Sequence, residues 1–137
     1  MCFLKVNQDE ILKRYAAGES SFQRVNLQEA ELTNANLRSA DFSNADLRQT
    51  RLGKTNLSQA CLRETNLSEA ILWRIDLSEA DLYRTILHEA DLTGAKLVQI
   101  RLDEANLIKA SLCGAKLNAA KLSGSLLIQA DLRPSSN

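Results

Sequence analysis

A leucine recurs at every fifth residue through most of this chain. From Phe22 to Leu132 there are 23 such positions, and all are leucine except Phe22 and Phe42. At ~100° per residue, a helix would turn about 140° between successive leucines and spread them over every side. In a flat strand, an odd step places successive leucines on opposite faces. The period therefore predicts a chain that changes direction once in every five residues, with all the leucines pointing to one axis.

Such a chain is an all-β solenoid whose coils stack through backbone hydrogen bonds at ~4.8 Å. Two residues before each central position a small side chain is usual, with Ala at 14 of the 23. Little room remains beside a leucine in a packed core, so a small neighbour fits there. Asn or Asp directly precedes the central residue 11 times. These side chains bond to nearby backbone and tolerate tight turns.

Two runs, ANLRSADFSNADLRQ (35–49) and ADLYRTILHEADLTGAKL (80–97), resemble the A(D/N)LxX motif of pentapeptide-repeat proteins. The resemblance covers residues 20–134 and implies a right-handed quadrilateral β-helix. In that fold four successive pentapeptides make one square coil. Equivalent residues of successive coils would then stack, which places Phe22 beneath Phe42.

We expect three segments: residues 1–19 with a short capping helix, a β-helix of just under six coils over 20–134, and a tail over 135–137. The helix should begin at Asn7 or Gln8, carry acidic residues in its first turn and stop at Gly18. After Leu132 only RPSSN follows. We therefore expect no helix over the last coil, whose edge is blunted by Pro134 and the tail or is covered by another chain.

The charge balance excludes several classes of partner. Basic and acidic residues number 17 each, so no overall field attracts the chain to nucleic acid or to an anionic membrane. The N-terminus lacks the apolar run of a secretory signal, and no stretch approaches the ~20 apolar residues of a membrane span. The three cysteines lack metal-ligand spacing. Reduced thiols in the cytoplasm are the simplest interpretation.

Catalysis is not expected, because no acid, base and nucleophile converge in the pattern. The five glycines are scattered, so no phosphate-binding loop is present, and His88 is the sole histidine. His88 with Glu89 and Glu69 could be read as a metal site, but a lone histidine on a solvated wall is usually a surface side chain. We predict no cofactor and no metal.

Apolar residues replace polar ones at several positions that flank a central leucine and should face outward. They gather on two neighbouring walls near the C-terminal end, and clustered apolar groups often mark an interface. The alternative is that Trp73 lies flat over its own wall and the isoleucines only add strand propensity. The candidate interaction surface comprises Ile71, Trp73, Ile86, His88, Ile108, Leu126 and Ile128.

A second candidate surface is basic and consists of Lys96, Arg101, Lys116 and Lys121. It could contact an acidic partner or nucleic acid. A solvated face is the preferred interpretation, because no aromatic platform accompanies the charges.

These features predict a non-catalytic protein-interaction or scaffold module that docks a protein partner, or a second copy, through an apolar surface at the C-terminal end. The family resemblance also implies C-terminal dimers and bacterial regulators. A rival is a DNA mimic that acts on a type II topoisomerase. Zero net charge and a rod of only about 28 Å, at ~4.8 Å per coil, disfavour it. A structural protein without a dedicated partner is the remaining alternative.

Overall fold

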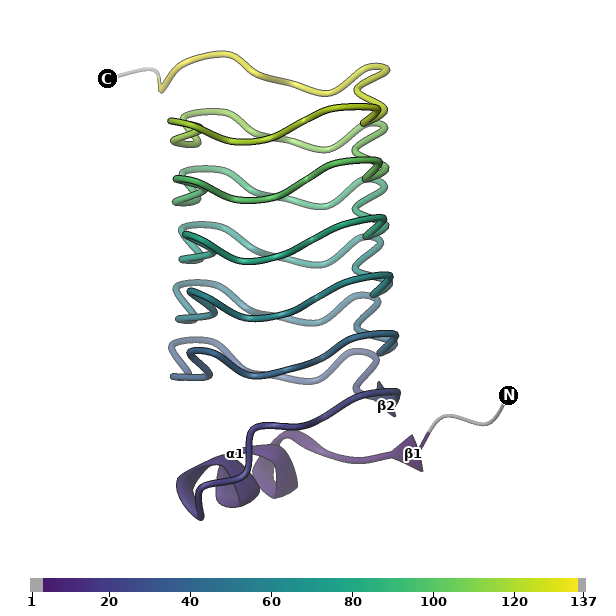
Figure 1. Cartoon of the computed structure of the whole chain (residues 1–137), viewed down its shortest axis with the longest axis vertical. Helices are drawn as coiled ribbons and strands as arrows, with labels where there is room; N and C mark the ends of the chain where they lie inside the picture. Colours follow the sequence, from purple (N-terminus) through teal and green to yellow (C-terminus); the bar gives the residue numbers. More distant parts are fainter. Residues whose placement is uncertain (1–3, 136–137) are drawn as a thin grey trace.

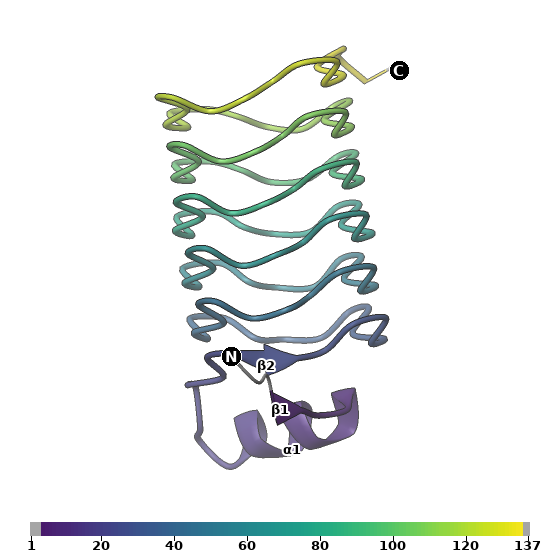
Figure 2. The ribbon, with the colours of Figure 1, turned by 90° about the vertical axis from the view of Figure 1, so that its right-hand side faces the viewer.

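In the computed structural model, which describes residues 4–135, the chain forms a stack of coils with the C-terminus at one end (Figure 1). Three short elements lie at the other end: β1 (Leu4–Lys5), α1 (Gln8–Ala16) and β2 (Val25–Asn26). Beyond them, isolated parallel bridges join each coil to the next, from Ser21 with Asp41 to Ser111 with Asp131. This register gives four pentapeptides to each coil. Figure 2 shows the same regular stacking from the side.

Each coil is bonded to the coil on either side of it. The N–H of Leu47 donates to the carbonyl of Asn66 at 2.8 Å, one coil onward, while the N–H of Asp46 donates to Val25 at 2.9 Å, one coil back. The pattern repeats along the rod, but turns interrupt it within every pentapeptide. Most walls therefore carry single bridges instead of extended strands.

The turn residue lies two places after each central residue and adopts a left-handed conformation. Every fifth residue from Arg24 to Gln129 has a positive φ, and most of these turn residues carry a side chain. The left-handed region costs such residues roughly 1–2 kcal/mol each. Bonding within the ladder offsets this cost; the turn residue Glu69, for example, donates its N–H to the carbonyl of His88 at 2.9 Å.

Asn and Asp directly before the central residue stabilise these turns through their side chains, as the sequence predicts. They do not themselves occupy the left-handed position, which lies three residues further on. The side-chain oxygen accepts from the N–H two residues onward, for example from Ser43 to Asp41 at 2.9 Å. The same bond forms at all eleven positions, which are Asn26, Asn36, Asp41, Asp46, Asn56, Asn66, Asp76, Asp81, Asp91, Asn106 and Asp131.

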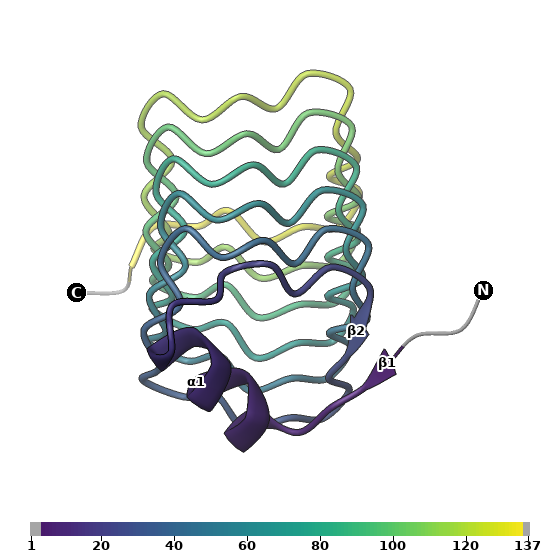
Figure 3. The same ribbon diagram turned by 60° about the horizontal axis from the view of Figure 1, so that its bottom comes forward.

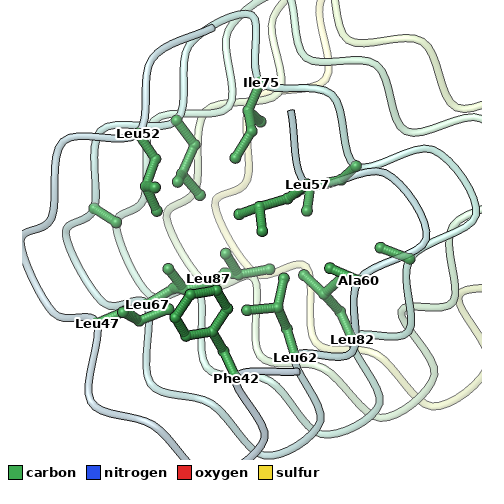
Figure 4. Close-up of a cluster of buried hydrophobic side chains, with 14 of the residues drawn as sticks. Phe42, Leu47, Leu52, Leu57, Ala60, Leu62, Leu67, Ile75, Leu82 and Leu87 are labelled. Atoms are coloured by element: carbon green, nitrogen blue, oxygen red, sulfur yellow. The ribbon is translucent and has the colours of Figure 1, made fainter. Parts of the chain in front are cut away.

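Central residues 20 apart stack in four columns. We call each column a wall and name it after its first central residue: the Phe22 wall, the Leu27 wall, the Leu32 wall and the Leu37 wall. The central side chains fill the interior (Figure 4) and are at most 2% exposed from Phe22 to Leu112. The rings of Phe22 and Phe42 stack with centroids 5.4 Å apart. This contact confirms the predicted stacking of equivalent residues in successive coils.

Threonine replaces the usual small residue at several buried sites. The hydroxyl groups of Thr55, Thr65 and Thr85 donate to main-chain carbonyls of the preceding coil at 2.5–2.7 Å. Every buried hydroxyl of the described chain thus has a partner, which removes the penalty of burying it.

Helix α1 lies across the N-terminal end of the stack (Figure 3). It begins after Asn7, whose side chain accepts from the N–H of Glu10 at 2.9 Å, and it ends at Ala16, within the stretch for which the sequence predicts a helix. Ile11 is fully buried against the core. Tyr15 donates its hydroxyl to the carbonyl of Arg38 at 2.8 Å, which ties the helix to the first coil.

The last described coil is less covered. Leu122 and Leu127 are only half-buried, and Leu132 is exposed. Within residues 4–135, the N–H groups of Leu122 and Leu127 have no main-chain acceptor. Of the predicted tail, residues 136 and 137 lie outside the described residues.

Asp46 makes the stability of the rod sensitive to acid. It is 7% exposed, and Arg48 donates to its two oxygens at 2.9 and 2.7 Å. These hydrogen bonds hold the pKa of Asp46 below its usual value, against burial, which raises it. A lowered folded pKa stabilises the protein above the unfolded pKa of about 3.9, and the stabilisation is lost as pH falls through the folded value.

We therefore expect wild type to exceed Asp46→Asn in free energy of unfolding near pH 6, and the difference to shrink below about pH 4. Urea titrations of both proteins over this range measure it. A difference that stays constant with pH would show that the carboxylate charge of Asp46 has no part in stability.

Candidate interaction surface

An apolar strip runs along the Leu27 wall near the C-terminal end. Ile86 is 38% exposed and is linked by successive bridges to Asn106 and then Leu126, which is 48% exposed. In the next column, His88 and Ile108 are half-buried and Ile128 is 63% exposed. The isoleucine strip, as we name it, comprises Ile86, Ile108, Leu126 and Ile128.

His88 lies in the same column as Ile108 and Ile128, with Nδ1 3.3 Å from the carboxylate of Glu89. Among residues 4–135, no group of three His, Cys, Asp or Glu side chains could hold a metal ion. The His88 contact is therefore a surface pair, of a kind that contributes little to stability.

Trp73 lies apart from the strip, on the Leu32 wall, where Ile71 is its half-buried neighbour. The indole packs on Gly53, one coil earlier: a Cβ atom at Gly53 would come within 2.6 Å of the ring. The ammonium group of Lys54 lies 5.3 Å from the ring centroid. The indole thus packs on its own wall, which is the arrangement expected if Trp73 has no docking role. A docking role for Trp73 stays a prediction.

Sequence reasoning missed the part played by Gly53. The signal was present, because Gly53 is a glycine directly after a central leucine and exactly one coil before the tryptophan. Because glycine has no Cβ atom, the indole can pack directly on the backbone at Gly53.

Gly53→Ala is expected to displace Trp73 and to cost about 1–3 kcal/mol through overpacking. Trp73 is the sole tryptophan, so its fluorescence reports the change as a red shift and easier quenching. Adding Trp73→Ser should recover most of the lost stability, because the serine removes the clash. An unchanged emission spectrum in Gly53→Ala would contradict the packing described here.

The four residues of the basic candidate surface differ in their contacts. Arg101 lies 3.2 Å from Asp103 and 3.8 Å from Asp81, and its guanidinium stacks on Tyr83 at 4.7 Å from the ring centroid. Arg101 therefore links neighbouring coils. Lys96, Lys116 and Lys121 are exposed, and among the described residues they have no carboxylate within 4.0 Å.

Tyr83 is the centre of a cluster on the Phe22 wall. Arg63 and Arg84 also contact its ring, at 4.8 and 5.4 Å. Arg84 pairs with Glu104 at 3.1 Å, one coil onward. Cation–π contacts and ion pairs of this exposed kind add modestly to the cohesion of the rod.

Among the hollows on the surface of the described chain, three have volumes of about 410, 260 and 340 Å³. None of these three brings together a nucleophile, a base and an oxyanion donor. Cys61 and Cys113 are free thiols on opposite walls. Within residues 4–135 no helix has the length and apolar character needed to cross a membrane.

The sequence matches the family model for pentapeptide repeats, in eight-copy units, over residues 20–59, 60–99 and 95–133. The chain is a pentapeptide-repeat protein. This result confirms the resemblance of its motifs, and known structures of the family are right-handed β-helices. Among curated proteins, none matches this pentapeptide-repeat protein in sequence.

Solved structures extend the comparison. HetL of Nostoc sp. strain PCC 7120, a pentapeptide repeat protein involved in heterocyst differentiation regulation, is 74% identical with a TM-score of 0.95. The match covers 96% of this chain but only 56% of HetL. Rfr23 of the cyanobacterium Cyanothece 51142 is 29% identical with a TM-score of 0.68, over 94% of this chain and 96% of Rfr23.

A more distant likeness shows the fold alone. QnrB1, a plasmid-mediated fluoroquinolone resistance protein, is 16% identical with a TM-score of 0.52. The match covers 82% of this chain and 62% of that protein.

Proposed function

We propose that this pentapeptide-repeat protein is a non-catalytic, cytoplasmic interaction module, in which a quadrilateral β-helix closed by α1 presents the isoleucine strip to a protein partner. The observation that carries the proposal is the strip itself. Three of its four residues are 38–63% exposed, on a rod whose outward positions are otherwise mostly polar. Main-chain bonds to the preceding coil hold the strip in register, from the N–H of Leu126 to the carbonyl of Ala105 and from the N–H of Lys109 to the carbonyl of Ile128, both at 2.9 Å. This register lowers the conformational entropy lost on docking.

The likeness to HetL supports a regulatory role. HetL is involved in heterocyst differentiation regulation, and it shares 74% of the aligned residues with this chain. We propose that the partner belongs to the control of cell differentiation. Because the chain spans 56% of HetL, this role is inferred for the repeat module that both proteins share.

DNA mimicry is the weaker candidate. The likeness to QnrB1 concerns the fold and not the surface charge. The net charge of this chain is zero. Three exposed lysines near the C-terminal end weaken this candidate further, because a protein that replaces DNA must present a negative surface.

The test compares wild type with Leu126→Asp/Ile128→Asp as bait in a lysate, with light scattering of each bait. Asn118→Asp/Ser123→Asp is the matched control, since it adds the same charge at exposed positions of two other walls. We expect wild type and control to capture one protein that the strip variant loses, and the purified partner to rebind with the same preference. Equal capture and equal mass for all three would refute the strip as the docking surface.

A further inference from the structure

Two turn residues on the Leu32 wall, Gly94 and Gly114, lack side chains where the backbone does not demand it. Their φ angles are 67° and 70°. Elsewhere at the same turn position, residues with side chains adopt φ between 55° and 65°. Conformational freedom therefore does not account for these glycines. What they supply is room for a neighbouring residue: Cγ of Arg74 lies 3.3 Å from the place of a Cβ atom at Gly94, and Cβ of Ser135 lies 3.3 Å from the place of one at Gly114.

Beside these two contacts, a groove of about 260 Å³ runs along the outside of the Leu32 wall. Trp73 and Arg74 line it on one coil, Thr93 and Gly94 on the next, and Cys113 and Gly114 on the third. Ser135 of the following coil completes the lining, against Gly114. A Cβ atom at Gly94 would lie 3.3 Å from Cγ of Arg74, so the aliphatic stem of Arg74 rests against Gly94. The indole and the arginine therefore meet at the same end of the groove.

The groove is positively charged. Arg74 is the sole charged residue in its lining, and Lys54 lies over the indole beside it. In the described chain, neither cation has a carboxylate within 4.0 Å, whereas Arg48 and Arg84 each have one and Arg101 has two. An unpaired guanidinium at the edge of an open groove is available for a bidentate bond to a carboxylate.

The groove is open and smaller than the ~300–1,000 Å³ of typical small-molecule pockets. Its length across three coils suits an extended chain instead. We propose that it binds an acidic, extended segment of a partner protein, with a carboxylate on Arg74 and the adjoining residue against the edge of Trp73. This site lies on another wall from the isoleucine strip and does not depend on the proposed function.

The experiment titrates the whole chain with the blocked peptide Gly-Glu-Gly-Glu-Gly and follows the fluorescence and the indole N–H resonance of Trp73. We expect a saturable change with a Kd on the order of 1 mM, typical of a single charge-assisted contact. Arg74→Gln should weaken binding about tenfold, and Gly94→Gln should abolish it by filling the groove. Gly124→Gln is the matched control, because its Cβ would also lie 3.3 Å from a long side chain, Glu104, on another wall.

The site is refuted if Trp73 does not respond below about 10 mM peptide, or if the Lys counterpart of the peptide binds equally well. It is also refuted if Gly94→Gln and Gly124→Gln behave alike, or if inorganic phosphate produces the same saturable change. Leu126→Asp/Ile128→Asp should bind the peptide as wild type does. The experiments can therefore refute the docking role of the isoleucine strip and the peptide-binding role of the groove independently of each other.

Discussion

Leu87→Asp is expected to unfold the β-helix. Leu87 is fully buried on the Leu27 wall, and the main-chain bonds between successive coils place it between Leu67 and Leu107 in the stack. A carboxylate there would have no partner, and an uncompensated buried charge costs about 3–5 kcal/mol or more. That cost is comparable to the whole stability of a small domain. Far-ultraviolet circular dichroism and a urea titration measure the loss.

The neighbouring residue supplies the control. Ile86→Asp places the same charge one position earlier, where the side chain faces solvent, and is expected to change stability by less than about 0.5 kcal/mol. Leu67→Asp should reproduce the effect of Leu87→Asp one coil earlier. A folded Leu87→Asp protein with the spectrum of wild type would overturn the inward placement of the leucine columns.

Phe42→Ala should produce the second-largest loss. Phe42 is 1% exposed and stacks on Phe22 with ring centroids 5.4 Å apart. Truncation removes the transfer free energy of the ring and leaves a cavity, which together cost about 3–5 kcal/mol. The backbone of neighbouring coils is fixed by hydrogen bonds in both directions, so the site cannot collapse around the cavity. Thermal and urea unfolding of the variant measure the loss.

Phe42→Leu separates this packing effect from a special role for phenylalanine. Leucine occupies the equivalent central position in the next coil, at Leu62, with 0% exposure. We expect a cost well below that of Phe42→Ala, on the order of 1 kcal/mol, because leucine restores most of the volume. Equal losses for the two variants would indicate that the aromatic stack itself holds the first coils together.

The interior of this rod was predictable from sequence, because a strict period of five leaves one consistent direction for the leucines. The turn conformation was not predictable from residue type. Arg24, Glu69 and Lys54 adopt a left-handed φ that favours glycine or asparagine, and the ladder of hydrogen bonds imposes it.

The surface was predicted less completely. The columns of the isoleucine strip follow from the coil length, so the sequence places Ile86 beneath Leu126 by way of Asn106. Side-chain orientation does not follow from that arithmetic. Arg101 was grouped with free lysines, yet it pairs with Asp81 and Asp103, because a long guanidinium stem reaches acids on adjacent coils. Trp73 likewise packs backward onto Gly53, a contact that depends on the missing side chain there.

The two-way bonding of each coil also governs how the rod comes apart. Main-chain bonds between coils reach only to partners on the adjoining coil, so cohesion is passed from coil to coil and no contact joins the ends of the described chain. Local unfolding is then expected to begin at the less covered C-terminal coil and to proceed coil by coil toward the middle. Amide protons around Leu122 and Leu127 should exchange with solvent sooner than those around Leu67 and Leu72. The rod is thus most compliant where the isoleucine strip ends and stiffest at its middle coils.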